Sequence, residues 1–225
     1  DVDIRRMQPF QANRSYLQSR VSETLGLLYA DHFPYRQFAS ARGVRRSPIY
    51  SQLEAEGACF GEASGWERAN WFLPKTAKDA GKKAEYDYSW RRQNWFEYSA
   101  AEHMAVRQKV GMFDMSSFGK IKLIGRDAEA VLQRIAANDV AVPVGKIVYT
   151  QFLNSEGHIE ADVTITRLGA DEFLIVTPAA TIRRDLHWIN GHIPDSSHAI
   201  AIDISVSESV FVVMGPDARS FLQPL

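Results

Sequence analysis

A regular series of strand and helix patterns from residue 119 onward constrains the fold more than any other feature of the chain. The segment 120–125 alternates like a strand, and the segment after it keeps four apolar residues on one helical face: Ala128, Val131, Leu132 and Ile135. Strands at 146–153 and 158–168 are joined by the turn residues Asn-Ser-Glu-Gly, and a strand, a helix at 181–193 and two strands follow. This β-α-β-β-β-α-β-β order predicts an α+β fold with a mixed, largely antiparallel sheet and packed helices, not a doubly wound parallel one.

The earlier part of the chain predicts a helical and irregular segment. Residues 18–30 carry an apolar stripe on one helical face: Val21, Leu25 and Leu28. After an irregular stretch, Pro48 is placed to open a short helix that Gly57 stops.

A change in amino-acid composition separates this early segment from the strand and helix pattern that follows. Residues 74–88 are rich in Lys, Gly and Ala and are the best candidate for a linker. Ser99 and Glu102 then have the spacing of a capping box, which predicts a helix that starts there and ends at Gly111.

The charges are balanced overall but unevenly distributed. The 26 Lys and Arg nearly cancel the 27 Asp and Glu, so no electrostatic case exists for binding nucleic acid or a membrane surface. Residues 1–50 hold eight Arg and no Lys. Because a guanidinium pairs with carboxylates through two parallel hydrogen bonds, these arginines favour protein–protein pairing over a nucleic-acid stripe.

The single cysteine excludes a disulfide within the chain and a cysteine metal cluster. Cys59 lies in the apolar run GACFG, which favours a small buried hydrophobe over a nucleophile and fits a reducing compartment. No apolar run approaches the roughly 18 residues of a membrane helix. Both ends look cut, so we expect a piece of a longer polypeptide.

A seven-residue pattern, W-x-R-x-N-W-F, occurs at 66–72 and again at 90–96. It is compatible with a two-unit repeat, a paired aromatic platform or two packing motifs. The surroundings of the first copy are too acidic for a nucleic-acid platform, which favours packing of the four tryptophans: Trp66, Trp71, Trp90 and Trp95. Arg68 and Arg92 are expected to stack on indoles or to pair with nearby acids: Glu62, Glu67 and Glu97.

Signatures of common catalytic sites are missing from the sequence. It has no dinucleotide or phosphate loop, and its six His do not form a ligand set, so we expect no metal site. The strand at 158–168 is more informative, because its apolar residues alternate with a polar set: His158, Glu160, Asp162, Thr164 and Thr166. That polar face fits either a solvated strand or the wall of a ligand pocket, and periodicity does not separate the two.

Several long strings resemble one protein family. They include RRSPIYSQLEAEGACFGEASGWERANWF, VGMFDMSSFGK, RIAANDVAVPVGKIVYTQFLNSEGHIEADVTI and VTPAATIRRDLHWI. The chain resembles the dimethylglycine and sarcosine dehydrogenases, in which an FAD-dependent amine-oxidising domain precedes a folate-binding domain like the glycine-cleavage T-protein, an aminomethyltransferase. The resemblance implies a connector at 1–75, a linker or junction at 76–94 and the N-terminal part of the folate domain at 95–225.

The resemblance also implies a chemistry. In that family a flavin oxidises an N-methyl amine to an iminium, and tetrahydrofolate captures the one-carbon unit as 5,10-methylenetetrahydrofolate. Asp162 matches the second of two adjacent aspartates in the T-protein pattern and is the implied catalytic residue, whereas Ala161 replaces the first. The implied positions for binding tetrahydrofolate are Phe118, Tyr149, Asp162, Thr164, Thr166, Val176, Thr177 and Pro178. Thr177 or Pro178 stands where the T-protein usually has Asn.

The expected function is therefore that of a fragment, inactive alone, of an FAD- and tetrahydrofolate-dependent oxidoreductase. Two alternatives stay open: a non-catalytic regulatory subunit of the pyruvate dehydrogenase phosphatase type, and a stand-alone aminomethyltransferase. The expected partners are an N-methyl amine or its iminium, the upstream FAD domain of the same polypeptide and, possible in this family, a second copy of the protein. We expect neither nucleic acid nor a membrane as partner, and a location in the bacterial cytoplasm or the mitochondrial matrix.

Overall fold

The structure, a computed structural model, describes residues 3–225. The chain forms two compact units. Unit 1 combines the residues up to Gln8 with Ser117–Ser209, and unit 2 combines Pro9–Ser116 with Val210–Leu225. The expected boundaries at 75/76 and 94/95 stay predictions about domains, while these units describe how the chain packs.

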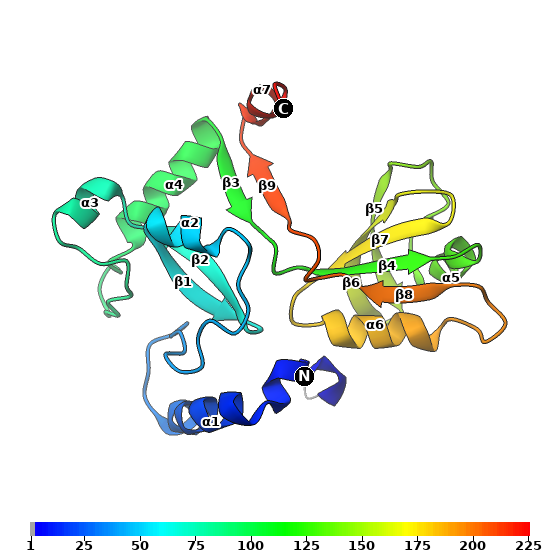
Figure 1. The fold of residues 1–225 in the computed structure, drawn as a ribbon, viewed down its shortest axis with the longest axis horizontal. Coiled ribbons are helices and arrows are strands. Elements are labelled where there is room, and N and C mark those ends of the chain that lie inside the picture. Colours follow the sequence, from blue (N-terminus) through cyan, green and yellow to red (C-terminus); the bar gives the residue numbers. More distant parts are fainter. Residues whose placement is uncertain (1–2) are drawn as a thin grey trace. The chain divides into compact units, whose positions relative to one another are not determined.

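Unit 1 is built on a five-stranded sheet in which every neighbouring pair is antiparallel, with the strand order β5-β6-β7-β4-β8 (Figure 1). Its strands are β4 (Gly119–Ile124), β5 (Ile147–Leu153), β6 (Ile159–Arg167), β7 (Glu172–Thr177) and β8 (Ile200–Asp203). Its helices are η1 (Ile4–Arg6), α5 (Ala128–Ile135) and α6 (Ile182–Gly191). The predicted α+β class and the predicted order of elements are confirmed.

One face of this sheet carries the core of unit 1. Inward side chains from β4, β5, β6 and β7 form a single cluster with the buried faces of α5 and α6. The apolar face predicted for α5 is buried in full, as are Phe152, Phe173 and Ile189. Because both long helices contribute to this one cluster, no long helix among the described residues of unit 1 covers the opposite face, which we call the open face.

The hairpin between β5 and β6 forms at the predicted turn. The Asn154 side chain accepts hydrogen bonds from the backbone N–H groups of Glu156 and His158, at 3.0 Å each. Gly157 adopts a φ of +81°, a left-handed conformation that a side chain disfavours. An irregularity in register after Phe152 leaves Ile159 exposed, although strict alternation predicted it inside.

Unit 2 holds two two-stranded antiparallel sheets, β1–β2 and β3–β9. Its strands are β1 (Ala58–Ala63), β2 (Trp66–Phe72), β3 (Gly111–Asp114) and β9 (Phe211–Met214). Its helices are η2 (Pro9–Ala12), α1 (Arg14–Tyr29), α2 (Tyr50–Ala55), α3 (Lys75–Asp79), α4 (Phe96–Gln108) and α7 (Ala218–Leu222).

Two helices predicted in the early segment are confirmed. The side chain of Asn13 caps α1 by accepting hydrogen bonds from the N–H groups of Ser15 and Tyr16. The predicted apolar stripe on α1 is exposed, with Leu28 71% accessible. Helix α2 stops before Gly57, whose φ of +93° marks the chain reversal.

The capping box predicted at Ser99 is wrong. Helix α4 begins three residues earlier, after Trp95, and has no side-chain cap. The Glu102 carboxylate instead accepts a hydrogen bond from the N–H of Phe72 in β2, at 2.7 Å. A tertiary contact therefore takes the side chain that the local pattern assigned to the helix N-terminus.

Arginines of the early segment pair with carboxylates of the β1–β2 hairpin, so the predicted pairing with carboxylates occurs here within the chain. Arg20 donates to Glu62 at 3.0 Å, and both side chains are over nine-tenths buried. Arg42 forms a two-pronged pair with Glu67. Arg45 lies over the ring of Trp66, with 4.4 Å from its guanidinium carbon to the ring centre.

Candidate functional site

The open face of the sheet brings together most of the residues expected to bind tetrahydrofolate. The register places Lys120, Val176, Thr164 and Tyr149 in one row across β4, β7, β6 and β5. Asp162 lies two residues before Thr164 and therefore on the same face of β6. The predicted polar face of β6 is confirmed from residue 160 onward, since Ala161, Val163 and Ile165 point into the core.

The carboxylate of Asp162 is held by two neighbours on β5. Gln151, its cross-strand partner, donates from Nε2 to Oδ1 of Asp162 at 3.0 Å. The hydrogen bond from the Tyr149 hydroxyl to the Asp162 carboxylate raises the pKa of Tyr149, and partial desolvation and the negative charge add to the shift. Asp162 remains exposed, so it keeps lone pairs that a ligand N–H can reach.

The surface around Asp162 mixes ring, hydroxyl and methyl groups. Tyr149 is 61% accessible, while Thr164, Thr166 and Val176 are half-buried. Thr166 lies in the next row, opposite Ile147 on β5 and Leu174 on β7. Phe118, also half-buried, comes one residue before β4. Such a surface suits a ligand with both a flat apolar part and hydrogen-bonding nitrogens.

Two expected site residues lie elsewhere. Thr177 is buried, and its hydroxyl donates to the carboxylate of Asp185 on α6. Thr177 therefore belongs to the helix side of the sheet, as do Phe173 and Ile175 at the same parity of β7. Pro178 is exposed beyond the strand, and its carbonyl accepts from the N–H of Thr181.

Gln151 and Lys120 are site neighbours that sequence reasoning missed. Gln151 is found only through the β5–β6 register, which the hairpin turn sets. Lys120 ends the row on β4, has an accessible fraction of only 1%, and its backbone N–H donates to the Ser205 hydroxyl at 3.0 Å. Lys120 was missed because the pairing of β4 with β7 is a long-range contact that no local sequence pattern predicts.

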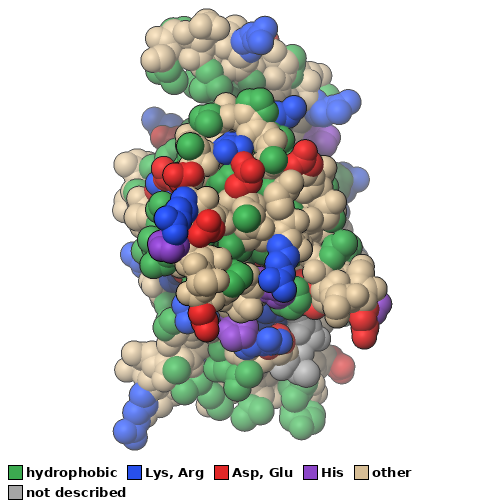
Figure 2. All heavy atoms as spheres, turned by 90° about the vertical axis from the view of Figure 1, so that its right-hand side faces the viewer, with side chains coloured by type: hydrophobic (Ala, Val, Ile, Leu, Met, Phe, Trp, Pro, Cys, Tyr) green, Lys and Arg blue, Asp and Glu red, His purple; other side chains and the backbone are tan. Residues whose placement is uncertain are grey.

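No metal cluster accompanies this site in the part of the chain that the structure describes. Within residues 3–225, no group of three or more His, Cys, Asp or Glu side chains is placed to hold a metal ion. Figure 2 shows Lys and Arg intermixed with Asp and Glu on one side of the molecule, without a patch of one sign. None of the described helices is both long and apolar enough to span a membrane.

Two family models match the chain. The GCVT N-terminal domain matches residues 49–225, and the FAD dependent oxidoreductase central domain matches residues 1–47. Among solved structures, the glycine cleavage system aminomethyltransferase T of Bartonella henselae superposes with a TM-score of 0.65. That likeness covers 81% of this chain and 44% of that one at 21% identity, and it supports the predicted fold.

Relatives with assigned names match nearly the whole chain. The 4-methylaminobutanoate oxidase (formaldehyde-forming) of Paenarthrobacter nicotinovorans is 43% identical over 98% of this chain and 26% of its own length. The mitochondrial pyruvate dehydrogenase phosphatase regulatory subunit of Mus musculus is 32% identical over 100% of this chain and 26% of its own. Mitochondrial sarcosine dehydrogenase of Homo sapiens is 29% identical over 98% and 28%.

The chain thus spans about a quarter of the length of each of these relatives. The resemblance inferred from the sequence is confirmed at the level of its two family segments. The chain belongs to the GCVT N-terminal domain family, and part of an FAD dependent oxidoreductase central domain precedes that domain.

Proposed function

We propose that the full-length protein is an FAD-dependent oxidoreductase acting on an N-methyl amine, and that the open face of unit 1 binds tetrahydrofolate. The two family segments on one chain support this, as do relatives named as a methylaminobutanoate oxidase and a sarcosine dehydrogenase. The observation that carries the folate part is the exposed Asp162 carboxylate, held beside Tyr149 by Gln151.

The residues of the open face fit a reduced folate. Its pterin has a flat pyrimidine ring and carries several N–H groups, which match an exposed tyrosine ring, a carboxylate acceptor and two threonine hydroxyls. The chain offers no comparable fit for FAD, because its sequence contains no dinucleotide-binding loop. We therefore assign FAD to another part of the full-length polypeptide.

Tetrahydrofolate, when bound, supplies the nitrogens that take up the one-carbon unit. Asp162 orients it by accepting an N–H hydrogen bond and can hold the proton that leaves a nitrogen as the nitrogen attacks. Gln151 fixes the orientation of the carboxylate by donating to its Oδ1. Tyr149 offers its ring as a stacking surface.

The test uses the full-length protein with tetrahydrofolate and an N-methyl amine such as sarcosine, dimethylglycine or 4-methylaminobutanoate. Asp162→Asn keeps the shape of the side chain and removes its charge, so 5,10-methylenetetrahydrofolate formation should fall by about 100-fold. Flavin bleaching by the amine should stay unchanged, and formaldehyde should replace the folate product. Asp171→Asn, at an exposed carboxylate before β7, is the matched control. Equal loss of flavin reduction and folate product in Asp162→Asn would refute the division of labour.

A non-catalytic regulatory subunit is the second candidate, favoured by the 32% identity to a pyruvate dehydrogenase phosphatase regulatory subunit over the whole chain. Failure of every tested N-methyl amine to bleach a protein-bound flavin would support it. The oxidoreductase segment at 1–47 argues against a stand-alone aminomethyltransferase.

We further propose the bacterial cytoplasm or the mitochondrial matrix as location, because two of the relatives are named as mitochondrial. The upstream FAD domain and a second copy of the protein remain the proposed partners. Fractionation of the source cells and size-exclusion chromatography with light scattering test these two points.

A further inference from the structure

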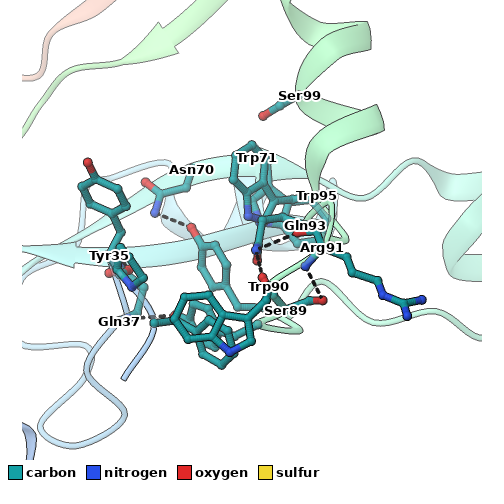
Figure 3. Close-up of a pocket in the computed structure, with 14 residues that line it drawn as sticks. Tyr35, Gln37, Asn70, Trp71, Ser89, Trp90, Arg91, Gln93, Trp95 and Ser99 are labelled. Atoms are coloured by element: carbon teal, nitrogen blue, oxygen red, sulfur yellow. Dashed lines mark hydrogen bonds between the residues drawn. The ribbon is translucent and has the colours of Figure 1, made fainter. Parts of the chain in front are cut away.

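Unit 2 contains a cavity of about 560 Å³, the size of a small-molecule site. Three separate stretches of chain line it: residues 33–37, residues 70–71 and residues 86–99. Seven of the fourteen lining residues are aromatic, and Figure 3 shows Trp71, Trp90 and Trp95 near the loop that leads into α4, with the ring of Tyr35 apart from them.

The two W-x-R-x-N-W-F copies meet at this cavity. The first copy is the strand β2 and contributes Trp71, which is 2% accessible. The second copy contributes Trp90 and Trp95 from the loop before α4. Trp90 is 82% accessible, and its ring lies against Phe33 with ring centres 4.6 Å apart, so most of it stays outside the packed interior that was expected to hold it.

Two of the rings, those of Tyr86 and Tyr88, are held in place by hydrogen bonds at their hydroxyl ends. The Tyr88 hydroxyl accepts from the N–H of Gln37 at 2.8 Å, and the Tyr86 hydroxyl accepts from the Asn70 amide at 2.7 Å. The two tyrosine rings are nearly parallel, with centres 5.5 Å apart. The wall of the cavity is thus an ordered aromatic surface that needs little rearrangement to bind a ligand.

The cavity holds almost no charge. No Asp or Glu lines it, and the guanidinium of Arg91, the one charged residue in the lining, extends away from the rings (Figure 3). Elsewhere in unit 2, ring faces carry cations of the chain itself, as in Arg45 over Trp66. In the part of the chain that the structure describes, no Lys or Arg lies over any of the seven rings.

We propose that this cavity binds a methylated ammonium group. Anions and strongly hydrated cations would lose their water there without gaining a counter-charge. A methylated ammonium is weakly hydrated, fills an apolar space with its methyl groups and is attracted by the negative faces of aromatic rings. The cavity and its rings alone support this inference, so it stands or falls apart from the proposed oxidoreductase activity.

The test is a titration of the full-length protein with choline, followed by tryptophan fluorescence and by calorimetry. The uncharged isostere 3,3-dimethylbutan-1-ol has the same shape and should bind about tenfold more weakly. Trp90→Ala removes an exposed ring, which spares the fold, and should weaken choline binding by about tenfold. Trp90→Phe keeps an aromatic ring at this position and should retain most of the affinity for choline. Tyr29→Ala, at an exposed ring of α1 that does not line the cavity, is the matched control.

Three results would overturn the proposal. The first is no binding of choline to the unaltered protein at millimolar concentration, and the second is unchanged choline binding in Trp90→Ala. Equal affinity for choline and its neutral isostere would show an apolar cavity without cation recognition. Because each readout is binding, none depends on flavin reduction or on a folate product.

Discussion

Replacing Glu67 with Gln should destabilise unit 2 although the two side chains have the same size. The Glu67 side chain is 3% accessible and accepts hydrogen bonds from the Arg42 guanidinium and from the N–H of Gly43. Arg42 also donates to the backbone carbonyls of Phe38 and Phe60. The pair thereby ties the segment before α2 to both strands of the β1–β2 hairpin.

The size of the effect follows from the burial of the pair. Removing one partner of a fully buried ion pair costs about 3–5 kcal/mol, because the other charge is left without compensation. The Arg42 side chain is 29% accessible, so water compensates part of that loss. We expect the Glu67→Gln variant to lose about 2–3 kcal/mol of unfolding free energy, which corresponds to a Tm lower by about 4–12 °C.

The effect should also depend on pH. Burial raises the pKa of Glu67, but hydrogen bonds from Arg42 and Gly43 and the charge of Arg42 outweigh it, and the net pKa is lowered. A carboxylate with a lowered folded-state pKa stabilises the protein above its unfolded pKa of about 4.3 and loses that contribution as the pH falls through the folded value. The difference in unfolding free energy between the unaltered protein and Glu67→Gln should thus be constant from pH 7 to about 4.5. Below about pH 4.5 this difference should become smaller.

Urea denaturation followed by tryptophan fluorescence measures these differences. The matched control is Glu97→Gln, which removes the carboxylate of the exposed Arg92–Glu97 pair, where the two side chains are 66% and 70% accessible. That pair should contribute less than about 0.5 kcal/mol. The reasoning fails if Glu67→Gln and Glu97→Gln unfold at the same urea concentration.

Three further predictions concern the core, one turn and the cysteine. Phe152→Ala, at a fully buried position of unit 1, should cost about 3–5 kcal/mol in urea denaturation, whereas Ile147→Ala, 62% accessible on β5, should cost less than about 1 kcal/mol. Gly125→Ala should cost more than about 1 kcal/mol, because φ is +137° and a new methyl group would collide with the His198 carbonyl; an unchanged Tm would contradict this. Burial raises the pKa of the Cys59 thiol to about 11, so it should react with thiol reagents at neutral pH only after denaturant is added, as thiol titration can check.

Periodicity predicted unit 1 well because its elements are amphipathic and locally connected. The helical face around Leu132 and the alternation of Val163 and Ile165 each mark a surface that must be buried, and the structure buries them in one cluster. The turn after Asn154 then fixes the β5–β6 register. Pairings between distant segments, such as β4 with β7 and β3 with β9, have no local signal and were not predicted.

The β1–β2 hairpin was not predicted, although the sequence contains a recognisable turn signal between its strands. Ser64 and Gly65 both have positive φ, at 52° and 81°, and a Ser-Gly pair between two apolar runs is typical of a tight hairpin. The residues that the two copies of the seven-residue pattern share form the strand β2 in the first copy and a loop leading into α4 in the second, so the shared pattern does not by itself determine the secondary structure.

The candidate site was partly predictable for the same reasons. Alternation along β6 placed Asp162 and Thr164 on one face, and the structure agrees. Applied to β7, the same rule would have placed Thr177 with Phe173 on the helix side, away from Asp162. Only the resemblance suggested Thr177, and whether it or Pro178 contacts a folate stays a prediction.

The buried arginine pairs of unit 2 show that the boundary between the two family segments is not a boundary between separately packed parts of the chain. The boundary between the two family segments falls at residue 48, yet Arg20–Glu62 and Arg42–Glu67 reach across it. A recombination event at that boundary would strand two carboxylates in the interior of the hairpin without their counterions. Exchange of the first segment between relatives is therefore tolerated only where the incoming piece carries both arginines, and exchange of the second only where it carries both carboxylates.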